Sequence, residues 1–527
     1  MAPGPTGHMR RLPVHLAIEF GRTGRYVAML VVLLLLTGMV WHFVLGQPWV
    51  PAAPQVVALA WGREPESLNP LWARNLGQWD WRPLLFDALV RLDGSGRLLP
   101  NLATGWQPDD SLTRWRFALR PGVRWHDGQP LTADDVVFTI NTIADYWCPA
   151  LGWEDWRGVR AVPIGDFRVE IVLPDPDPVL PFRLSEVYIL PKHRLEGLPV
   201  KEWQRGAFAL APVGTGPFRF DHWVRGERLE LHRNADYHGG QPALGGIRLC
   251  FHPREMAAGS CHAYLLTDGR HEVPDGFRAT VYAGPVGYHV VFGAKSGLFE
   301  SPSVRRAWAV LCQEAATRAH PGIIPSSSLF PPGSWLDELA EQMPRGEELA
   351  VEALMSEAGW RQGRGGVWQR DDQPFAVDLE VLPAGDLTWE LAELCVERLQ
   401  DAGFEVSARR VSWQRWWDIA TGRESFDVVL GWWPDSPYGH LFVADVAVYR
   451  SGAWDELCQQ LEGMWELPAR AGQLKEFTEW FVQEGWPWVP LGWQARTLVH
   501  APELQGIEPG PFGWLWNVGR WWWGASR

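Results

Sequence analysis

The most suggestive pair of chemically active side chains is His126-Asp127, because an imidazole beside a carboxylate could act as a general base. The pair also has a structural interpretation, since Asp127-Gly128 is typical of a tight turn. The 15 histidines are dispersed along the chain, and neither HExxH nor GxSxG, the zinc-protease and serine-hydrolase signatures, occurs. We therefore interpret the pair as turn chemistry and predict that the protein is not an enzyme.

The six cysteines give no recognisable metal or redox pattern. They include no CxxC pair and have no histidine at zinc-ligand spacing. An oxidising compartment would permit disulfides, but isolated buried thiols explain the pattern equally well. We predict no metal and no cofactor, and assign no disulfide among Cys148, Cys250, Cys261, Cys312, Cys395 and Cys458.

Tryptophan is unusually abundant, with 35 among 527 residues. Indoles bury large areas and also line ligand pockets and interfaces. For any single tryptophan, packing in the core is the safer prediction. The indoles concentrate at Trp413 to Trp417, Trp432 to Trp433, Trp486 to Trp493 and Trp514 to Trp523.

The elements that position such side chains are clearest in residues 114–146. Apolar residues alternate with polar or small ones from Arg114 to Arg120, which predicts a half-buried strand. Pro121-Gly122 ends that strand, and Val123 and Trp125 begin a second short strand before the Asp127-Gly128 turn. Local sequence thus predicts two strands in succession.

A helix should follow this pair of strands. Thr132 and Asp135 have the spacing of a capping box, in which each side chain bonds the other's backbone. The apolar residues after them recur at helical spacing, so that strands and helix must close over a common core. These residues are Val136, Val137, Ile140, Ile143 and Ala144.

Composition sets further bounds on the protein. A chain that is 46% hydrophobic and 527 residues long can bury a large core and should fold as two or three lobes. Its net charge of −14 argues against nucleic acid as a partner, because phosphate recognition requires clustered Lys and Arg.

Residues 26–45 contain no Asp, Glu, Lys or Arg and are long enough to cross a bilayer as a helix. Arg22 and Arg25 precede them, and no Lys or Arg follows until Arg63, which predicts a cytoplasmic segment over 1–25. A cleaved signal peptide is the alternative, but no convincing cleavage site follows promptly. We predict an uncleaved anchor, a linker over 46–55 and a folded part on the outer face of the bacterial cytoplasmic membrane.

The run from Trp115 to Val136 resembles the signature of the extracellular solute-binding proteins of family 5, the dipeptide and oligopeptide receptors of ABC importers. The VGTGPF turn at 213–218, whose glycines let backbone approach backbone, and the strand FDVVLGWW at 426–433 resemble the same family. The resemblance implies an α/β, two-lobed periplasmic-binding-protein fold of type II-like form with an extra subdomain. It places lobe I at 56–85, 185–285 and 490–527, the extra subdomain at 86–184 and lobe II at 286–489.

The resemblance also implies a ligand site at the end of the FDVVLGWW strand. In the peptide-binding members a carboxylate just after this strand binds the ligand's terminal ammonium, and Asp435, beside Trp432 and Trp433, stands at that position. A solvated loop aspartate is the alternative, because Ser436-Pro437 departs from the usual spacing. Gly293, where the family commonly has Asn, and the unusual helix end at 311–314 place the ligand in more doubt than the fold.

The resemblance implies a peptide-binding component that delivers solute to ABC permease subunits. One alternative is a receptor for an oligosaccharide or a metal chelate, which would use the tryptophans and would not need Asp435. Another is a membrane-anchored sensor or regulator with the same fold. Residues 1–25 are too short for a helix-turn-helix domain.

Overall fold

The computed structural model describes residues 56–72, 80–146, 156–251, 261–267, 273–338, 350–383, 385–421, 423–434, 437, 460, 464–483 and 486–524. The predicted segments over 1–25, 26–45 and 46–55 lie outside these ranges, as does Asp435. Within the ranges, no helix has both the length and the apolar character to cross a membrane.

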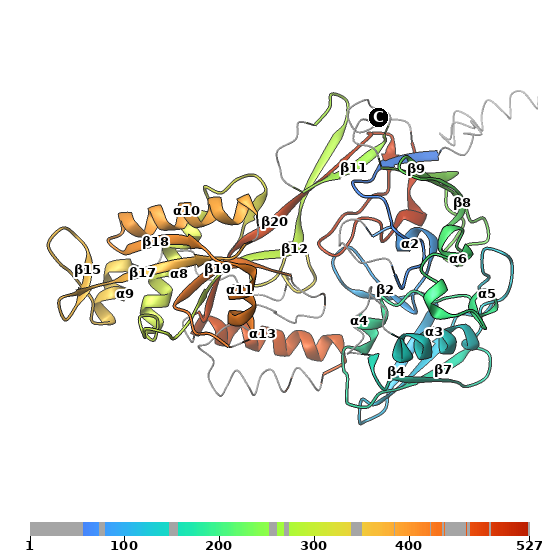
Figure 1. The fold of residues 1–527 in the computed structure, drawn as a ribbon, viewed down its shortest axis with the longest axis horizontal. Coiled ribbons are helices and arrows are strands. Elements are labelled where there is room, and N and C mark those ends of the chain that lie inside the picture. Colours follow the sequence, from blue (N-terminus) through green and yellow to red (C-terminus); the bar gives the residue numbers. More distant parts are fainter. Residues whose placement is uncertain are drawn as a thin grey trace, which may run out of the picture. The chain divides into compact units, whose positions relative to one another are not determined.

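An 11-stranded mixed sheet runs through the described chain (Figure 1). β1 pairs in parallel with β10 and β11, and β17 pairs in parallel with β18 and β19, whereas the remaining pairs are antiparallel. The strand order is β18 (Glu405–Arg410), β17 (Ala376–Val381), β19 (Val428–Pro434), β12 (Arg278–Phe292), β20 (Trp488–His500), β11 (Ala263–Leu266), β1 (Val56–Ala60), β10 (Gly246–Cys250), β9 (Arg228–Arg233) and β8 (Phe218–Val224), with β13 (Ile323–Pro325) also on β20.

Buried side chains form two large hydrophobic clusters. We name them cluster 1, which runs from Val57 to Leu265 and resumes at Leu498, and cluster 2, which runs from Tyr288 to Leu491 with Phe182 added. Helices α8 (Pro302–Ala316), α9 (Val351–Glu357) and α10 (Asp386–Asp401) contribute to cluster 2, as does α13 (Leu467–Gln483). The predicted buried strand over 426–433 is confirmed as β19, whose residues 428–431 are all buried between β17 and β12.

A smaller antiparallel sheet contains the predicted half-buried strand. Its order is β4 (Ala103–Pro108), β5 (Arg114–Leu119), β7 (Arg168–Val172) and β6 (Arg160–Pro163). β5 alternates exposed and buried residues along its whole length, which confirms the prediction. The second predicted strand, at Val123 and Trp125, is wrong: only a single bridge between Arg124 and Pro130 forms there, because Pro121-Gly122 on one side and the start of a helix at Ala133 on the other limit the pairing.

Helix α3 (Ala133–Asp145) confirms the predicted capping box. The Thr132 N–H donates to Asp135 Oδ2 at 3.0 Å, which satisfies one of the donors that a helix N-terminus leaves unpaired. Val136, Ile140 and Ile143 are buried, and this face packs into cluster 1. Helix, cap and strand thus follow from local sequence.

Short elements complete the structure around cluster 1 and at the edge of cluster 2. They are α2 (Arg82–Leu85), β2 (Val90–Leu92), β3 (Leu98–Pro100), α4 (Leu180–Leu184), α5 (Lys192–Leu195), η2 (Val200–Glu202), α6 (Ala207–Leu210), β14 (Arg361–Gln362), β15 (Trp368–Arg370), β16 (Gln373–Pro374), β21 (Leu504–Gln505), η5 (Val518–Arg520) and β22 (Trp522–Trp523).

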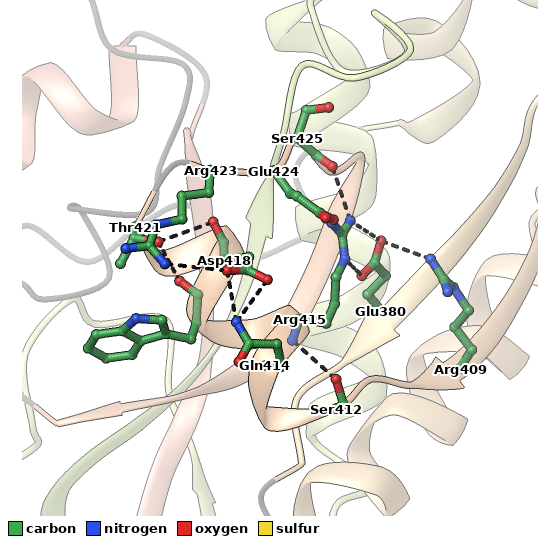
Figure 2. A network of polar contacts seen from close by, with 11 residues as sticks. Glu380, Arg409, Ser412, Gln414, Arg415, Asp418, Thr421, Arg423, Glu424 and Ser425 are labelled. Carbon is green, nitrogen blue, oxygen red and sulfur yellow. Dashed lines mark hydrogen bonds and ion pairs between the residues drawn. The ribbon is translucent and has the colours of Figure 1, made fainter.

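A network of ion pairs fixes α11 (Trp413–Ala420) against β17 (Figure 2). Glu380, whose side chain is only 4% exposed, accepts from Arg415 Nε and Nη2, both at 3.0 Å, and from Arg409 Nη2 at 3.1 Å. Arg415 also pairs with Glu424 and donates to the Ser425 carbonyl. Hydrogen bonding to Glu380 raises the pKa of Arg415. The arginines and carboxylates of this network therefore neutralise one another.

Replacing Arg415 by Met should lower the free energy of unfolding by about 3 kcal/mol, because the buried Glu380 then keeps only Arg409. Urea unfolding followed by circular dichroism measures the change. Arg423→Gln is the matched control, since its guanidinium is 65% exposed and lies 3.8 Å from Asp418. The control should cost less than about 1 kcal/mol, and equal effects of the two substitutions would contradict a special contribution from the buried pair.

Candidate functional site

A cavity of about 550 Å³ lies in the described part of the chain. Its walls come from α2 and the segment after it, the β2–β3 hairpin, residues 185–188 and 237–239, and the C-terminal segment 511–520. Pro285 of β12, Arg496 of β20 and Pro437 complete the lining. The volume is typical of a small-molecule site, which usually measures about 300 to 1,000 Å³.

A buried carboxylate, Asp87, organises one wall of the cavity. Four side chains donate to it: Asn101 Nδ2 at 3.1 Å, Thr215 Oγ1 at 3.0 Å, Tyr237 Oη at 3.2 Å and His238 Nε2 at 3.0 Å. Burial by itself raises the pKa of Asp87, but the neighbouring His238 and the hydrogen bonds outweigh it and hold the pKa below its usual range. Asp87 is therefore an ionised anchor whose two oxygens are already occupied.

A buried guanidinium, that of Arg82, organises a second wall. Its Nε lies 2.7 Å from Asp80 Oδ1, its Nη2 lies 3.7 Å from Glu186 Oε2, and its charged carbon lies 4.8 Å from the centre of the Tyr188 ring. Burial lowers the pKa of Arg82, but the Asp80 carboxylate more than offsets this effect and the pKa is raised. Arg82 and Asp80 thus form an ion pair with each other.

Two further arginines reach the cavity near Tyr237. Arg91 lies with its charged carbon 5.9 Å from the centre of the Trp516 ring and donates from Nη1 to the Trp516 carbonyl at 3.4 Å. Arg120 Nε donates to the Asn101 carbonyl at 3.2 Å. Burial and Asp87 raise the pKa of Tyr237, whereas Arg91 and Arg120, which line the same cavity, act to lower it.

Arg496 enters the cavity from β20 and packs across the neighbouring strand. A Cβ atom on Gly284 of β12 would lie 2.7 Å from Arg496 Nε, so the guanidinium packs directly over the backbone at that glycine. Burial lowers the pKa of Arg496, and Tyr282, its partner in the β-ladder, opposes that shift. The central sheet therefore contributes a cation to the lining of the cavity.

The C-terminal segment supplies an aromatic wall. Phe512, Trp514 and Trp516 line the cavity, and the Trp514 ring stacks 6.1 Å from Trp61 of cluster 1. The segment approaches the β2–β3 turn so closely that a Cβ atom on Gly96 would lie 2.5 Å from the Phe512 ring. The tryptophan concentration at 514–523 thus contributes both to the core and to the cavity.

The structure describes two of the three predicted ligand residues, Trp432 and Trp433, and both are at least partly buried. Trp433 is 5% exposed with its ring 5.9 Å from His289, and Trp432 is half-buried against cluster 2. Neither tryptophan lines the cavity. Asp435 lies outside the described residues, but Pro437, two residues later, does line the cavity, and its carbonyl accepts from Trp335 Nε1 at 2.8 Å.

His126 occupies a structural position. The Gly214 N–H donates to its Nδ1 and its Nε2 faces the Gly216 carbonyl, both at 3.1 Å, while burial lowers the pKa of His126 to about 4. A Cβ atom on Gly214 would lie 1.8 Å from the Leu85 carbonyl oxygen. The close backbone approach predicted for the VGTGPF turn is confirmed, and the imidazole serves that turn.

Two departures from the family pattern also have structural explanations. A Cβ atom on Gly293 would lie 2.1 Å from the Phe426 carbonyl oxygen, so the sheet backbone leaves room only for glycine. In α8, Gln313 Nε2 donates to the Pro490 carbonyl at 3.2 Å, and Glu314 pairs with Arg398 at 2.9 Å. None of these residues lines the cavity.

Sequence reasoning missed most of the cavity. Asp87, Arg91, Tyr237 and Arg496 had no predicted role, and neither had Arg120, although it stands inside the run from Trp115 to Val136 that resembles the family. Across the ranges that the structure describes, no group of three or more His, Cys, Asp or Glu side chains gathers as metal ligands. The available chemistry is ionic and aromatic recognition.

Comparison with known proteins identifies the family to which this sequence is similar. Residues 97–447 match the sequence model of the bacterial extracellular solute-binding proteins, family 5. The oligopeptide-binding protein AppA of Bacillus subtilis is 24% identical over 503 residues, which cover 87% of this chain and 90% of AppA.

Solved structures give the same answer for the fold. The AppA structure with a nonapeptide has a TM-score of 0.61 at 20% identity and covers 90% of this chain and all of that one. A nickel ABC transporter structure from Bacillus halodurans has a TM-score of 0.72 at 18% identity, covering 87% and 98% of the two chains. NikA from Brucella suis with Fe(III)-EDTA has a TM-score of 0.68 at 21% identity, with coverage of 87% and 98%. The predicted two-lobed α/β solute-binding fold is confirmed.

Replacing Asp87 by Asn should lower the free energy of unfolding at pH 7 by about 2 kcal/mol, because hydrogen bonds to a charged group are lost. Since the folded pKa is lowered, ionised Asp87 stabilises the fold above the unfolded value of about 3.9, and this contribution disappears as pH falls through the folded pKa. Asp87→Asn should therefore flatten the loss of stability below about pH 4.

Urea unfolding from pH 3 to pH 7 measures this effect, with the exposed Asp110→Asn as control. Stability curves for wild type and Asp87→Asn that run parallel across this pH range would contradict the assigned role.

Proposed function

Because this chain belongs to the bacterial extracellular solute-binding proteins of family 5, we propose that it is the peptide-binding component of an ABC importer. It binds di- or oligopeptides in the 550 Å³ cavity and delivers them to membrane permease subunits. The observation that carries the proposal is the cavity itself, where charged side chains and an aromatic wall converge from both ends of the chain. No catalytic step is proposed.

Asp435 remains the proposed partner of the peptide's ammonium group. Two observations support it. Pro437, two residues later, lines the cavity. The described carboxylates of the lining are already occupied, Asp80 and Glu186 by Arg82 and Asp87 by its four donors. An ammonium group removed from water requires a charged acceptor, which Asp435 would supply.

Trp432 and Trp433 remain proposed residues of this site with different contributions. Trp433, buried against His289, fixes the end of β19 from which the chain continues to Asp435. Trp432 is half-buried and keeps part of its indole surface available. Their proposed role is to position the Asp435 loop and to border the solute.

We also propose the lobe boundaries given by the family resemblance. Lobe I comprises 56–85, 185–285 and 490–527, its extra subdomain comprises 86–184, and lobe II comprises 286–489. The division between cluster 1 and cluster 2 at residues 288–491 supports the border of lobe II. Cluster 1 is continuous through the extra subdomain, which supports counting that subdomain with lobe I.

A metal-chelate receptor is the second candidate. Five arginines in the cavity would suit an anionic chelate. Of the similar structures, one is a nickel ABC transporter and another is NikA in complex with Fe(III)-EDTA. An oligosaccharide receptor would use the aromatic wall but not the five arginines, and no feature of the cavity bears on a membrane-anchored sensor. The order of preference is peptide, then chelate.

The proposed location is the outer face of the cytoplasmic membrane, with residues 26–45 as an uncleaved anchor. Membership of an extracellular family supports the compartment. The uncharged run and the arginines before it support the anchor and its orientation.

Asp435→Asn should weaken peptide binding by about 2 to 5 kcal/mol if lobe closure desolvates the ammonium pair, and by about 1 kcal/mol or less if the aspartate is solvated. Calorimetry should use peptides identified by mass spectrometry of solute released from the purified protein, each with a free and an acetylated N-terminus. Acetylation and Asp435→Asn should each weaken binding, and the double change should cost less than their sum. Equal affinity of wild type for free and acetylated peptides would remove Asp435 from the site and favour the chelate receptor.

Protease added to spheroplasts should digest the folded part of the protein, because the arginine distribution orients it outward. Immunoblotting of the full-length band measures this, with a cytoplasmic protein as the protected control. A protected full-length band would contradict the topology. A mature N-terminus beyond Leu45 would contradict the anchor.

A further inference from the structure

More positively than negatively charged side chains line the cavity. Two of the three carboxylates bind Arg82, and the third, Asp87, has both oxygens occupied by neighbouring donors. Cations therefore remain after the carboxylates have been assigned. The five cations are Arg82, Arg91, Arg120, Arg496 and Arg520, and the three carboxylates are Asp80, Asp87 and Glu186.

In the part of the chain that the structure describes, the partners of Arg91 and Arg120 are the uncharged Trp516 and Asn101. Arg91 contacts the face and the carbonyl of Trp516, and its Nε is buried without a hydrogen bond. Arg120 donates to the carbonyl of Asn101. A carbonyl or an indole face offsets only part of a guanidinium charge, so each arginine can still bind an anion.

The two arginines also converge on one place. Both line the cavity, and across the β2–β3 hairpin Arg91 pairs with Leu99, two residues before the Asn101 carbonyl that accepts from Arg120. Asn101 links Arg120 to Asp87, since its side chain donates to Asp87 while its carbonyl accepts from Arg120. The Asp87 network therefore fixes Asn101, which supports Arg120, whereas Trp516 supports Arg91 and leaves the Arg91 Nε donor unused.

We infer that Arg91 and Arg120 form a carboxylate subsite of the cavity, so that the bound solute carries a carboxylate at this end. Guanidinium groups are planar forks that match a carboxylate with two parallel hydrogen bonds, and Trp516 holds one face of Arg91 in place. The inference deepens the proposed function, on which it rests for taking this cavity as the solute site. A peptide C-terminus, an acidic side chain and a carboxylate chelate share this chemistry.

The test uses the full-length protein with three probes of defined chemistry. They are a tripeptide library with free C-terminal carboxylates, the same library as C-terminal amides, and ferric EDTA, which has carboxylates but no ammonium group. Gel filtration and mass spectrometry identify the retained probes, and calorimetry gives the dissociation constants. The variants are wild type, Arg91→Gln with Arg120→Gln, and the control Arg124→Gln.

Arg124 is a matched control because it lies four residues from Arg120, is exposed, donates to the Gly128 carbonyl at 2.9 Å and does not line the cavity. Wild type and Arg124→Gln should bind free acids at least about thirtyfold more tightly than amides, as for a buried charge pair. The double Gln variant should lose that preference. If its thermal unfolding midpoint falls, the corresponding double Lys variant, which keeps the charges but not the fork, should retain part of the preference.

The outcomes separate this inference from the proposed function. Equal binding of acids and amides overturns the carboxylate subsite and leaves peptide binding intact. Retention of amides only when they contain Asp or Glu supports the subsite and assigns the carboxylate to a side chain. Retention of ferric EDTA but not peptides, lost in the double Gln variant, supports the subsite and overturns peptide binding. No retained probe overturns both.

Discussion

The buried carboxylate of Asp87 is the interaction on which the cavity depends. Its donors come from Asn101, Thr215, Tyr237 and His238, so one anion joins the end of α2 to the β3 loop, the VGTGPF turn and the segment after β9. A buried charge is tolerated only when its partners are in place, and removing one partner leaves an uncompensated cost. These separate segments must therefore reach the same geometry together, and that geometry positions the remaining walls.

Arginines and carboxylates have different roles around Glu380 and in the cavity. Around Glu380, two arginines and a second carboxylate satisfy one another, and the result is a fixed helix (Figure 2). In the cavity, the carboxylates are consumed internally while Arg91 and Arg120 keep hydrogen-bonding capacity. The first arrangement stabilises a lobe, whereas the second prepares a surface that an anionic group would complete.

The central sheet connects these regions through two long strands. β12 and β20 pair with each other along most of their length, and β12 also pairs with β19 of cluster 2 while β20 pairs with β11 of cluster 1. Arg496 on β20 reaches the cavity from this shared ladder. Arg496 thus ties the cavity to the backbone that links the two clusters.

Local sequence by itself determined β5, the capping box of α3 and the buried strand β19, because periodicity and capping act over a few residues. The close approach at Gly214 came from the resemblance of the VGTGPF turn to the family. Sequence reasoning overstated the strand at Val123, where only a single bridge forms, and it singled out tryptophans at 432 and 433 that do not line the cavity. Only the tertiary structure assembled the cavity. Its walls run from Asp80 to Arg520, and long-range strand pairing, which no local pattern encodes, decides which of these residues meet.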